Sequence, residues 1–417
     1  MRIFERLQAK LLAGLCALIL AGVQLPGSGP AQAADDVIRL GAAISLTGKY
    51  STNGMNTRDG YMLAAERVNA AGGVTVGDKT YRLEVVFYDD ESTPARAAQL
   101  AERLIRQDGV QFLLGPYSSG LTKAMAPVTE KYAVPMVEGN GASISLFDKG
   151  YRYLFAVLST SDQYLKSAIT LAAEQARRDG RDPASLRLAG VFENDPFSQD
   201  IREGLMQDAA QYGMRFVIDD KLPPELNDMA TSLIKVKALK PDMLIISGHS
   251  KGAALAVRQL AEMRVDVPMV AMTHCDSAQI IEKFGEDAEY MLCASQWAAT
   301  LSYSDRWFGS AGQFAELFEE TYDYAPPYQA AESAASVLVY ADALTRAGKI
   351  DPEAVRDALA ETDMETFFGK VKFNAAGVNI AKPMVLFQVQ DGNYVVVAPS
   401  QWAAGSLRHP IPPWSAR

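Results

Sequence analysis

One segment, residues 109–143, constrains the fold more than any other part of the chain, because it alternates strand, turn and helix patterns. Two short apolar runs, Val110–Leu114 and Val134–Val137, each end in a turn of small residues. Between them, apolar side chains recur at helical spacing at Leu121, Met125, Val128 and Tyr132. A strand, a crossover helix and a second strand are expected to give parallel strands, so both turns open at one sheet edge, where doubly wound folds bind ligands.

These two turns predict a polar cradle. Ser118, Ser119 and Ser143 supply hydroxyl groups, and the neighbouring glycines leave backbone N–H groups accessible. The first turn carries no charged side chain. We therefore expect a site for a small anionic or polar group, formed by hydroxyls and amides.

The first 33 residues have the pattern of a secretory signal peptide. Basic residues precede the apolar run Leu11–Leu25, and a segment of small residues ends at Ala33, which predicts cleavage before Ala34. Cys16 does not suit lipidation, since Leu15 stands where a small residue is needed. No later stretch approaches the roughly 18 apolar residues of a membrane span. We expect an exported, soluble chain, and the net charge of −10 of the full sequence argues against nucleic acid as a partner.

Strand and helix patterns alternate along most of the chain, which indicates α/β architecture with parallel sheets. They include predicted strands at Val37–Ile44 and Lys370–Phe373 and a predicted helix at Asp59–Ala70. The alternation restarts near residue 158, and 417 residues suit two domains. Two cysteines remain after the leader, Cys275 and Cys293, and they form either a disulfide or two buried thiols. The tail, residues 401–417, matches no pattern.

The segment from Gly248 to Gly252 matches G-x-S-x-G, with Ser250 as a candidate nucleophile. The chain has only three histidines, at positions 249, 274 and 409, and none suits the order of a hydrolase triad. No dinucleotide, phosphate-loop or zinc-protease motif is present, so we predict no cofactor. Chance occurrence is the favoured interpretation of this motif.

His249, His274 and Asp276 follow neighbouring predicted strands, but two histidines and one carboxylate are a thin ligand set for zinc. We predict no metal, and expect these side chains either to line a cleft or to be ordinary loop residues. Asp276 would then pair with a ligand ammonium group. Trp297 is either a stacking platform or a packing residue at a hinge. The acidic run from Asp89 to Glu91 is interpreted as solvated side chains and helix caps.

With these residues in place, the chain resembles the type I periplasmic solute-binding proteins, in particular the leucine/isoleucine/valine-binding family of ATP-driven importers. The resemblance rests on segments that follow the family's order and span most of the chain after the leader. They are IRLGAAISLTGKYSTNG with GYMLAAERVNAAGGV, DDESTPARAAQLAERLI, GVQFLLGPYSSGLTKAMAPVTEKYAVPMVEGNGAS, LKPDMLIISGHSKGAALAVRQLAEM, and AAESAASVLVYADAL with AVRDALAETDMETFFGKVKFNAAG.

The resemblance implies two α/β lobes, each a doubly wound parallel sheet, joined by a three-strand hinge. Lobe one would comprise residues 35–157 and 299–369, and lobe two residues 158–298 and 370–400, followed by the tail 401–417. It also implies a set of ligand-binding residues contributed by both lobes. They are Asn53, Tyr117, Ser118, Ser119, Gly141, Ala142, Ser143, Phe197, His249, Asp276 and Trp297.

Several of these residues depart from the family's pattern. Asn53 and His249 stand where the family usually has an aromatic side chain, and Phe197 replaces a tyrosine. The acidic residue that grips an amino group falls near residue 275, which leaves Cys275 or Asp276 facing the ligand. The departures leave leucine, isoleucine or valine in question, with another amino acid, an amide or an aromatic carboxylate as alternatives.

We therefore expect a non-enzymatic, monomeric periplasmic receptor. It would capture a small carboxylate-bearing solute between two closing lobes and deliver it to the membrane permease of an ABC importer. The same role for an aromatic carboxylate or amide is the alternative. A secreted serine hydrolase that uses Ser250 is the alternative from another class.

Overall fold

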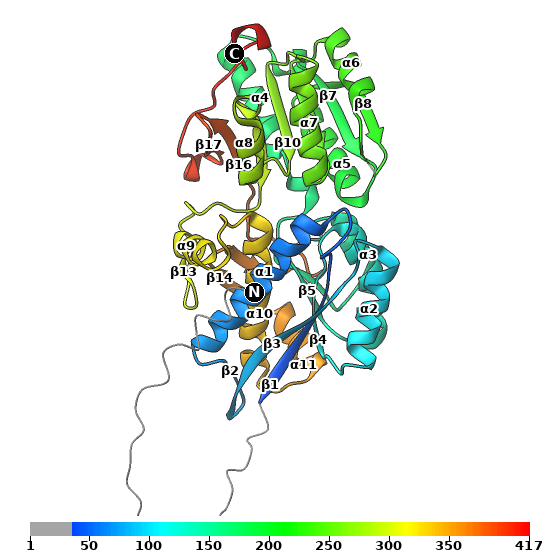
Figure 1. The fold of residues 1–417 in the computed structure, drawn as a ribbon, viewed down its shortest axis with the longest axis vertical. Helices are drawn as coiled ribbons and strands as arrows, with labels where there is room; N and C mark the ends of the chain where they lie inside the picture. The colour runs from blue at the N-terminus through cyan, green and yellow to red at the C-terminus, as the bar shows by residue number, and fades with distance from the viewer. Residues whose placement is uncertain (1–35, 225) are drawn as a thin grey trace, which may run out of the picture. The chain divides into compact units, whose positions relative to one another are not determined.

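The computed structural model of the 417-residue chain describes residues 36–224 and 226–417, and the predicted signal peptide lies outside them. Two large sheets, one of six strands and one of seven, organise this part of the chain (Figure 1). Most neighbouring strands are parallel, and the antiparallel pairs lie at or next to the sheet edges. The structure therefore confirms the predicted α/β fold with two mostly parallel sheets.

We call the six-stranded sheet and the helices packed on it lobe one. Its strands, in spatial order, are β2 (Val74–Val76), β3 (Lys79–Asp89), β1 (Val37–Ile44), β4 (Phe112–Leu114), β5 (Met136–Glu138) and β6 (Leu154–Ala156). Its helices are α1 (Ser51–Ala70), α2 (Pro94–Arg106), α3 (Ser119–Tyr132), α10 (Tyr328–Ala347) and α11 (Pro352–Ala360). The predicted strand–helix–strand unit is β4–α3–β5, whose strands pair in parallel at Leu113 and Met136.

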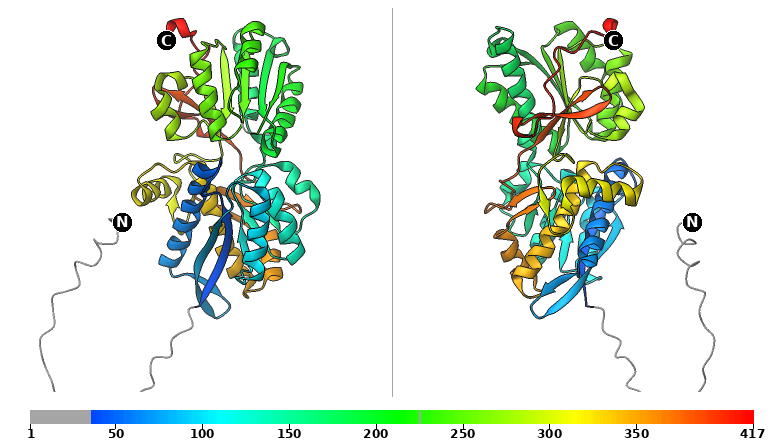
Figure 2. Two further views of the ribbon diagram at one scale, coloured as in Figure 1. Left: turned by 45° about the vertical axis from the view of Figure 1, so that its right-hand side comes forward. Right: turned by 90° about the vertical axis from the view of Figure 1, so that its left-hand side faces the viewer.

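We call the seven-stranded sheet and its helices lobe two. Its strands, in spatial order, are β17 (Asn393–Ala398), β16 (Val385–Gln390), β11 (Leu292–Ser295), β10 (Met269–Thr273), β9 (Met243–Ser247), β7 (Arg187–Glu193) and β8 (Arg215–Leu222). Its helices are α4 (Lys166–Arg178), α5 (Pro196–Gln211), α6 (Ala230–Leu239), α7 (Ser250–Glu262) and α8 (Ala278–Phe284). Figure 2 shows the C-terminal strands returning to this sheet, next to strands from the middle of the chain.

One further helix and two short ribbons lie outside the two large sheets. They are the helix α9 (Ala311–Tyr322), the ribbon of β12 (Ser304–Asp305) and β13 (Gly309–Ser310), and the ribbon of β14 (Asp363–Thr366) and β15 (Gly369–Lys372). β15, predicted as a strand of lobe two, pairs with β14 and not with the seven-stranded sheet. The residue boundaries proposed for the two lobes stay a prediction.

Lobe one buries α10 almost completely against α1, and this packing depends on small residues. A Cβ atom at Gly60 of α1 would lie 2.2 Å from the carbonyl oxygen of Ala330, so only glycine permits the approach. The helix α1 begins at Ser51, two turns before the predicted start at Asp59. Asn53 therefore lies in the first turn of a helix and not in a loop.

The segments that connect the two lobes are tied together by one buried amide. The Gln296 side chain accepts from the backbone N–H of Ser159 (3.0 Å) and donates to the Ser159 carbonyl (2.8 Å) and to the Tyr164 hydroxyl (2.9 Å). The Ser159 hydroxyl donates to the Lys382 carbonyl (2.7 Å), and the Lys382 ammonium donates to the Gln296 carbonyl. We call Ser159, Gln296 and Lys382 the hinge network.

The tail after residue 400 packs on lobe two. The backbone N–H of Ile411 donates to the carbonyl of Pro268 (2.9 Å), and the Trp414 indole donates to the carbonyl of Val265 (3.0 Å). Within residues 36–224 and 226–417, no helix is long and apolar enough to cross a membrane.

Candidate functional site

A cleft of about 710 Å³ is lined by residues of both lobes. Asn53 and Tyr328 reach it from the first turns of α1 and α10, and His274 and Asp276 reach it from the loop that follows β10. Trp297, next to the hinge network, also lines it. Three of the predicted ligand-binding residues, Asn53, Asp276 and Trp297, therefore meet at one cavity.

The two lobes contact each other through the Tyr117 hydroxyl, beside this cleft. The Asn53 amide donates to the Tyr117 oxygen (2.6 Å), which lies 3.1 Å from Nδ1 of His249 and 2.9 Å from Nε2 of His274. Nε2 of His274 is also 3.2 Å from the Tyr328 hydroxyl. A hydroxyl has one hydrogen, so Tyr117 donates to one imidazole and accepts from the other. We call Asn53, Tyr117, His249, His274 and Tyr328 the Tyr–His relay.

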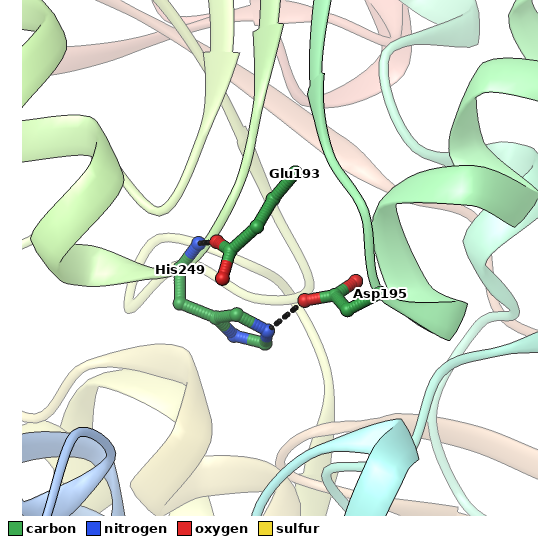
Figure 3. A group of neighbouring side chains, drawn as sticks. All are labelled: Glu193, Asp195 and His249. Carbon is green, nitrogen blue, oxygen red and sulfur yellow. Dashed lines mark hydrogen bonds and ion pairs between the residues drawn. The ribbon is translucent and has the colours of Figure 1, made fainter. Parts of the chain in front are cut away.

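His249 owes its orientation to two carboxylates of lobe two, which Figure 3 shows. Nε2 of His249 lies 2.7 Å from Oδ2 of Asp195, and the backbone N–H of His249 donates to Glu193 (3.3 Å). Burial alone would lower the pKa of His249, but the charges and hydrogen bond of these carboxylates outweigh it and raise that pKa. The pKa of Asp195 is lowered in spite of burial, chiefly by the His249 charge. This pair therefore favours a protonated His249, whose Nδ1–H donates to Tyr117.

His274 behaves in the opposite way. Burial, aided by the charge of His249, lowers the pKa of its imidazole to about 3, so it stays neutral and can accept from Tyr117. Its Nδ1 has no hydrogen-bond partner among the described residues. The relay thus runs from a charged imidazole through a phenol to a neutral imidazole that lines the cleft.

Glu193, Asp195 and His249 offer ligand atoms that all lie within 4.8 Å of one another, a spacing that suits a metal ion. However, Asp195 already pairs with His249, and the Lys49 ammonium lies 3.9 Å from Glu193. The positive charge that these carboxylates require comes from the protein itself. The set His249, His274 and Asp276 is not among the groups of described residues whose ligand atoms converge.

The predicted serine cradle is fully buried, and its groups bond mainly to the protein. The Ser119 hydroxyl accepts from the backbone N–H of Ser143 (3.0 Å), and the N–H of Gly141 donates to Glu138. The Ser143 hydroxyl donates to Asp200 of lobe two. None of the six predicted cradle residues, Tyr117, Ser118, Ser119, Gly141, Ala142 and Ser143, lines the 710 Å³ cleft among its described residues. Their contact with a ligand stays a prediction.

Ser118 caps α3 and adopts a left-handed backbone with φ of +83°. Its Oγ accepts from the N–H of Leu121 (3.4 Å), as an N-cap does. Ala142 accepts from the N–H of Ser161 (2.7 Å) through its carbonyl. These contacts fix the turn that places the Tyr117 hydroxyl against the histidines of lobe two.

Phe197 packs beneath the relay. Its ring centroid lies 5.6 Å from that of His249, 5.4 Å from that of His274 and 5.1 Å from that of Tyr164. The side chain is buried, in the first turn of α5. Phe197 therefore supports both imidazoles from the side of lobe two.

Cys275 is bonded to Cys293, which decides between the disulfide and the two thiols. The cross-link leaves Asp276 as the acidic group of this loop that lines the cleft. Burial raises the pKa of Asp276 to about 7. No ion pair to Asp276 exists within the described residues, so a cation in the cleft would stabilise its ionised form.

Trp297 packs next to the hinge network and also lines the cleft, so its contact with a ligand stays a prediction. Its indole N–H donates to the carbonyl of Phe367 (3.2 Å), and its ring meets those of Phe314 and Phe367 edge-on. Ser250 begins α7, and its hydroxyl donates to Asn53 (3.0 Å). The neighbouring His249 ring pairs with Asp195 and Tyr117, so Ser250 has no general base in this arrangement.

The sequence reasoning missed three residues of the site. Tyr50 packs its ring 4.8 Å from His249 and 5.4 Å from Tyr117. Asp195 orients His249, and Tyr328 closes the relay. The sequence contains a signal for Asp195, because an aspartate that follows a strand and precedes a proline is typical of the start of a helix. Tyr50 and Tyr328 had none, because only the packing of two distant segments brings them here.

Two lobes on mostly parallel sheets and a cleft lined from both lobes are an arrangement suited to a solute-binding receptor. The comparison with protein families agrees. The chain belongs to the periplasmic binding protein family, whose sequence pattern matches residues 37–393.

Curated relatives span nearly the whole chain at low identity, which confirms the predicted resemblance. The Leu/Ile/Val-binding protein homolog 7 of Brucella abortus is 24% identical over 409 residues, covering 95% of this chain and 99% of its own. The leucine-, isoleucine-, valine-, threonine-, and alanine-binding protein of Pseudomonas aeruginosa is 23% identical, covering 86% and 91%.

Solved structures share the fold. The substrate binding protein of a branched-chain amino acid transporter from Streptococcus pneumoniae, in complex with isoleucine, has a TM-score of 0.76 at 23% identity and covers 87% of this chain and 100% of its own. A solute binding protein of an ABC transporter from Rhodopseudomonas palustris, in complex with 3,4-dihydroxy benzoic acid, has a TM-score of 0.75 at 18% identity, covering 86% and 95%.

Proposed function

We propose that this chain is the receptor of an ABC importer and captures a small carboxylate-bearing solute, an amino acid or a related compound, between its two lobes. The observation that carries the proposal is the 710 Å³ cleft, which both lobes line and which is large enough for such a solute. The family and the relatives' ligands support the same class.

The chemistry of the cleft supports a solute with an amino group. Asp276 is a largely buried carboxyl without an ion pair among the described residues, and an ammonium group beside it would lower its raised pKa of about 7. Hydroxyl and amide groups of Ser250, Asn53 and Tyr328 lie on the same cavity and can donate to a carboxylate.

Closure needs contacts that form only when the lobes meet. The relay supplies such contacts, since Tyr117 and Asn53 belong to lobe one while His249 and Ser250 belong to lobe two. A solute that completes these hydrogen bonds, or replaces one of them, would favour the closed arrangement. The permease of the importer would then recognise the closed lobes of a monomeric receptor.

An aromatic carboxylate is the second candidate. The rings of His274, Trp297 and Tyr328 line the 710 Å³ cleft, and a planar ligand would pack against them. A relative of the same fold holds 3,4-dihydroxy benzoic acid and another holds benzoate.

Export to the periplasm through a cleaved leader of residues 1–33 is part of the proposal.

A thermal-shift screen of the ligand-stripped protein without its leader tests the proposal. A ligand at about 100 times its dissociation constant should stabilise the fold by roughly 2.7 kcal/mol, a shift of a few degrees. If aliphatic amino acids shift the melting temperature of the parent but not that of Asp276→Asn, the first candidate is supported. Benzoates that bind Asp276→Asn normally would support the second.

Ser250→Ala separates the receptor from a hydrolase. A receptor should still bind its solute and keep most of its affinity, because the variant loses one hydrogen bond to Asn53 and one of several groups that can donate to a carboxylate. A hydrolase would lose all turnover of an ester substrate. The proposal would be refuted if no amino acid or other carboxylic acid in the screen binds and the protein has an esterase activity that Ser250→Ala abolishes.

A further inference from the structure

A second cavity, of about 420 Å³, adjoins the 710 Å³ cleft. Four residues, Thr52, Asn53, Ser250 and Gln279, line both. The hydrogen bond from Ser250 to Asn53 therefore joins the lobes at the boundary between two chambers.

The two chambers carry opposite charges. The larger one is lined by four carboxylates, Asp276, Glu282, Glu319 and Asp323, and by no lysine or arginine among its described residues. The smaller one is lined by four lysine and arginine side chains, Lys49, Lys251, Arg258 and Lys283, together with His249, and by no carboxylate among its described residues. We call the larger cavity the acidic chamber and the smaller one the basic chamber.

Most of these charges have no strong partner of their own. The four carboxylates of the acidic chamber form no ion pair within residues 36–224 and 226–417. In the basic chamber, Lys251 donates to the amide of Asn227 (2.8 Å), and Lys283 lies over the Phe284 ring. Lys49 and Arg258 each stand 3.9 Å from a carboxylate outside the chamber lining.

Two neighbouring residues of one helix line different chambers. Glu282 and Lys283 follow each other in α8, yet the first lines the acidic chamber and the second the basic chamber. Charge separation across one short boundary creates a field along the cleft that a dipolar molecule would satisfy.

We propose that the solute carries an anionic group and a cationic group at separate ends, with its anionic end in the basic chamber and its cationic end in the acidic chamber. This inference rests on the proposed receptor function and names the solute class more narrowly. An α-amino acid bears both charges on one carbon, so it would occupy a single chamber. An elongated ω-amino acid or a short peptide has the required separation.

Three aliphatic probes that differ in their charged groups test the two-chamber arrangement by thermal shift at equal concentration. ε-Aminocaproate carries both charges, caproate only the anion, and hexylamine only the cation. We expect ε-aminocaproate to raise the melting temperature by several degrees, and each singly charged probe to raise it by far less. Added salt should weaken the effect, since most of these side chains are exposed.

Paired variants locate each end of the probe. Lys251→Gln with Lys283→Gln, and separately Glu319→Gln with Asp323→Asn, should each weaken ε-aminocaproate binding by about tenfold. The controls are Lys221→Gln in lobe two and Glu316→Gln on α9, each of which removes one charge of the same sign outside both chambers and should leave affinity unchanged. The unliganded melting temperature of each variant reports whether it folds.

The proposal is overturned if caproate or hexylamine binds as well as ε-aminocaproate, if ε-aminocaproate gives no shift, or if neither pair of variants weakens it. Leucine and benzoate distinguish this failure from failure of the receptor function. If either of them binds while ε-aminocaproate does not, the receptor function stands and the two-chamber inference falls.

Discussion

Two networks join the lobes, and they differ in how the protein satisfies them. In the hinge network, the Gln296 amide bonds to backbone groups of Ser159 and is fully buried. In the Tyr–His relay, contacts between the lobes are made by side chains alone, beside two cavities. The first network has no room for an exchange of partners, whereas a solute can replace bonds of the second. The hinge is therefore built to persist and the relay to be remade.

The largest effect should come from the hinge. Gln296→Ala would leave buried polar groups of Ser159 and Tyr164 without partners, and each such group costs about 1–3 kcal/mol. We expect the free energy of unfolding to fall by about 3 kcal/mol in urea titration. Gln163→Ala, a partly exposed glutamine near the same crossing, is the control and should cost less than about 1 kcal/mol. Equal losses in the two variants would show that the hinge amide is not special.

The disulfide that anchors the relay in lobe two ranks next. It closes a sequence separation of 18 residues between Cys275 and Cys293 and lies directly after His274. Replacing both cysteines with serine should reduce the free energy of unfolding by about 2–3 kcal/mol. Urea unfolding of the double variant, compared with the oxidised and reduced parent, measures this. If the reduced parent is as stable as the oxidised one, the cross-link does not stabilise the loop.

Tyr117→Phe isolates the relay, because it removes one hydroxyl and keeps the ring. Stability should fall by only about 1 kcal/mol, since Asn53, His249 and His274 border cavities where water can replace the phenol. Ligand affinity should change by about fivefold or more, because the bonds between the lobes change. Isothermal titration with the ligand found by the screen measures that change. A large stability loss with unchanged affinity would reverse the contrast between hinge and relay.

The sequence predicts the strands and helices that carry the two networks better than it predicts the contacts within them. β1 begins and ends at the predicted residues, Val37 and Ile44, because a buried strand is a continuous apolar run. α1 starts earlier than predicted, because Gly54 has the pattern of a turn residue in the sequence. In the structure Gly54 lies within the helix, and glycine is needed there because a Cβ atom would lie 1.9 Å from the Ser45 carbonyl oxygen. Local pattern cannot show such a close approach between segments.

The same limit applies to the site. The turns after β4 and β5 were predicted from the strand–helix–strand pattern, and the structure places both where lobe one meets lobe two. The Tyr117 hydroxyl, however, obtains its partners from residues 132 and 157 positions away along the chain. Such pairings depend on how two sheets meet, which periodicity does not encode. The sequence thus indicates candidate residues, and only the packing assigns their partners.

The smallest predicted effect is the pH dependence of the relay. Asp195 and Glu193 raise the folded-state pKa of His249 above its ordinary value of 6.5. A raised pKa means that protonated His249 contributes stability in full below about pH 6.5, and that this contribution is lost as pH rises through the folded-state pKa. His249→Gln retains hydrogen bonding but cannot titrate. The stability difference between parent and variant should therefore be constant at low pH and shrink above neutrality, by about 1 kcal/mol or less.

Urea titrations from about pH 5 to pH 9 measure this difference directly. Subtracting the variant removes the contribution of Asp276, whose raised pKa of about 7 also lowers stability as pH rises. Gln296→Ala provides the contrast, because the hinge amide does not titrate and its cost should not vary over this range. A parent-minus-variant difference that grows with pH would mean that His249 is neutral in the fold, with Tyr117 donating to it. The relay would then run in the opposite direction, from His274 through Tyr117 to His249.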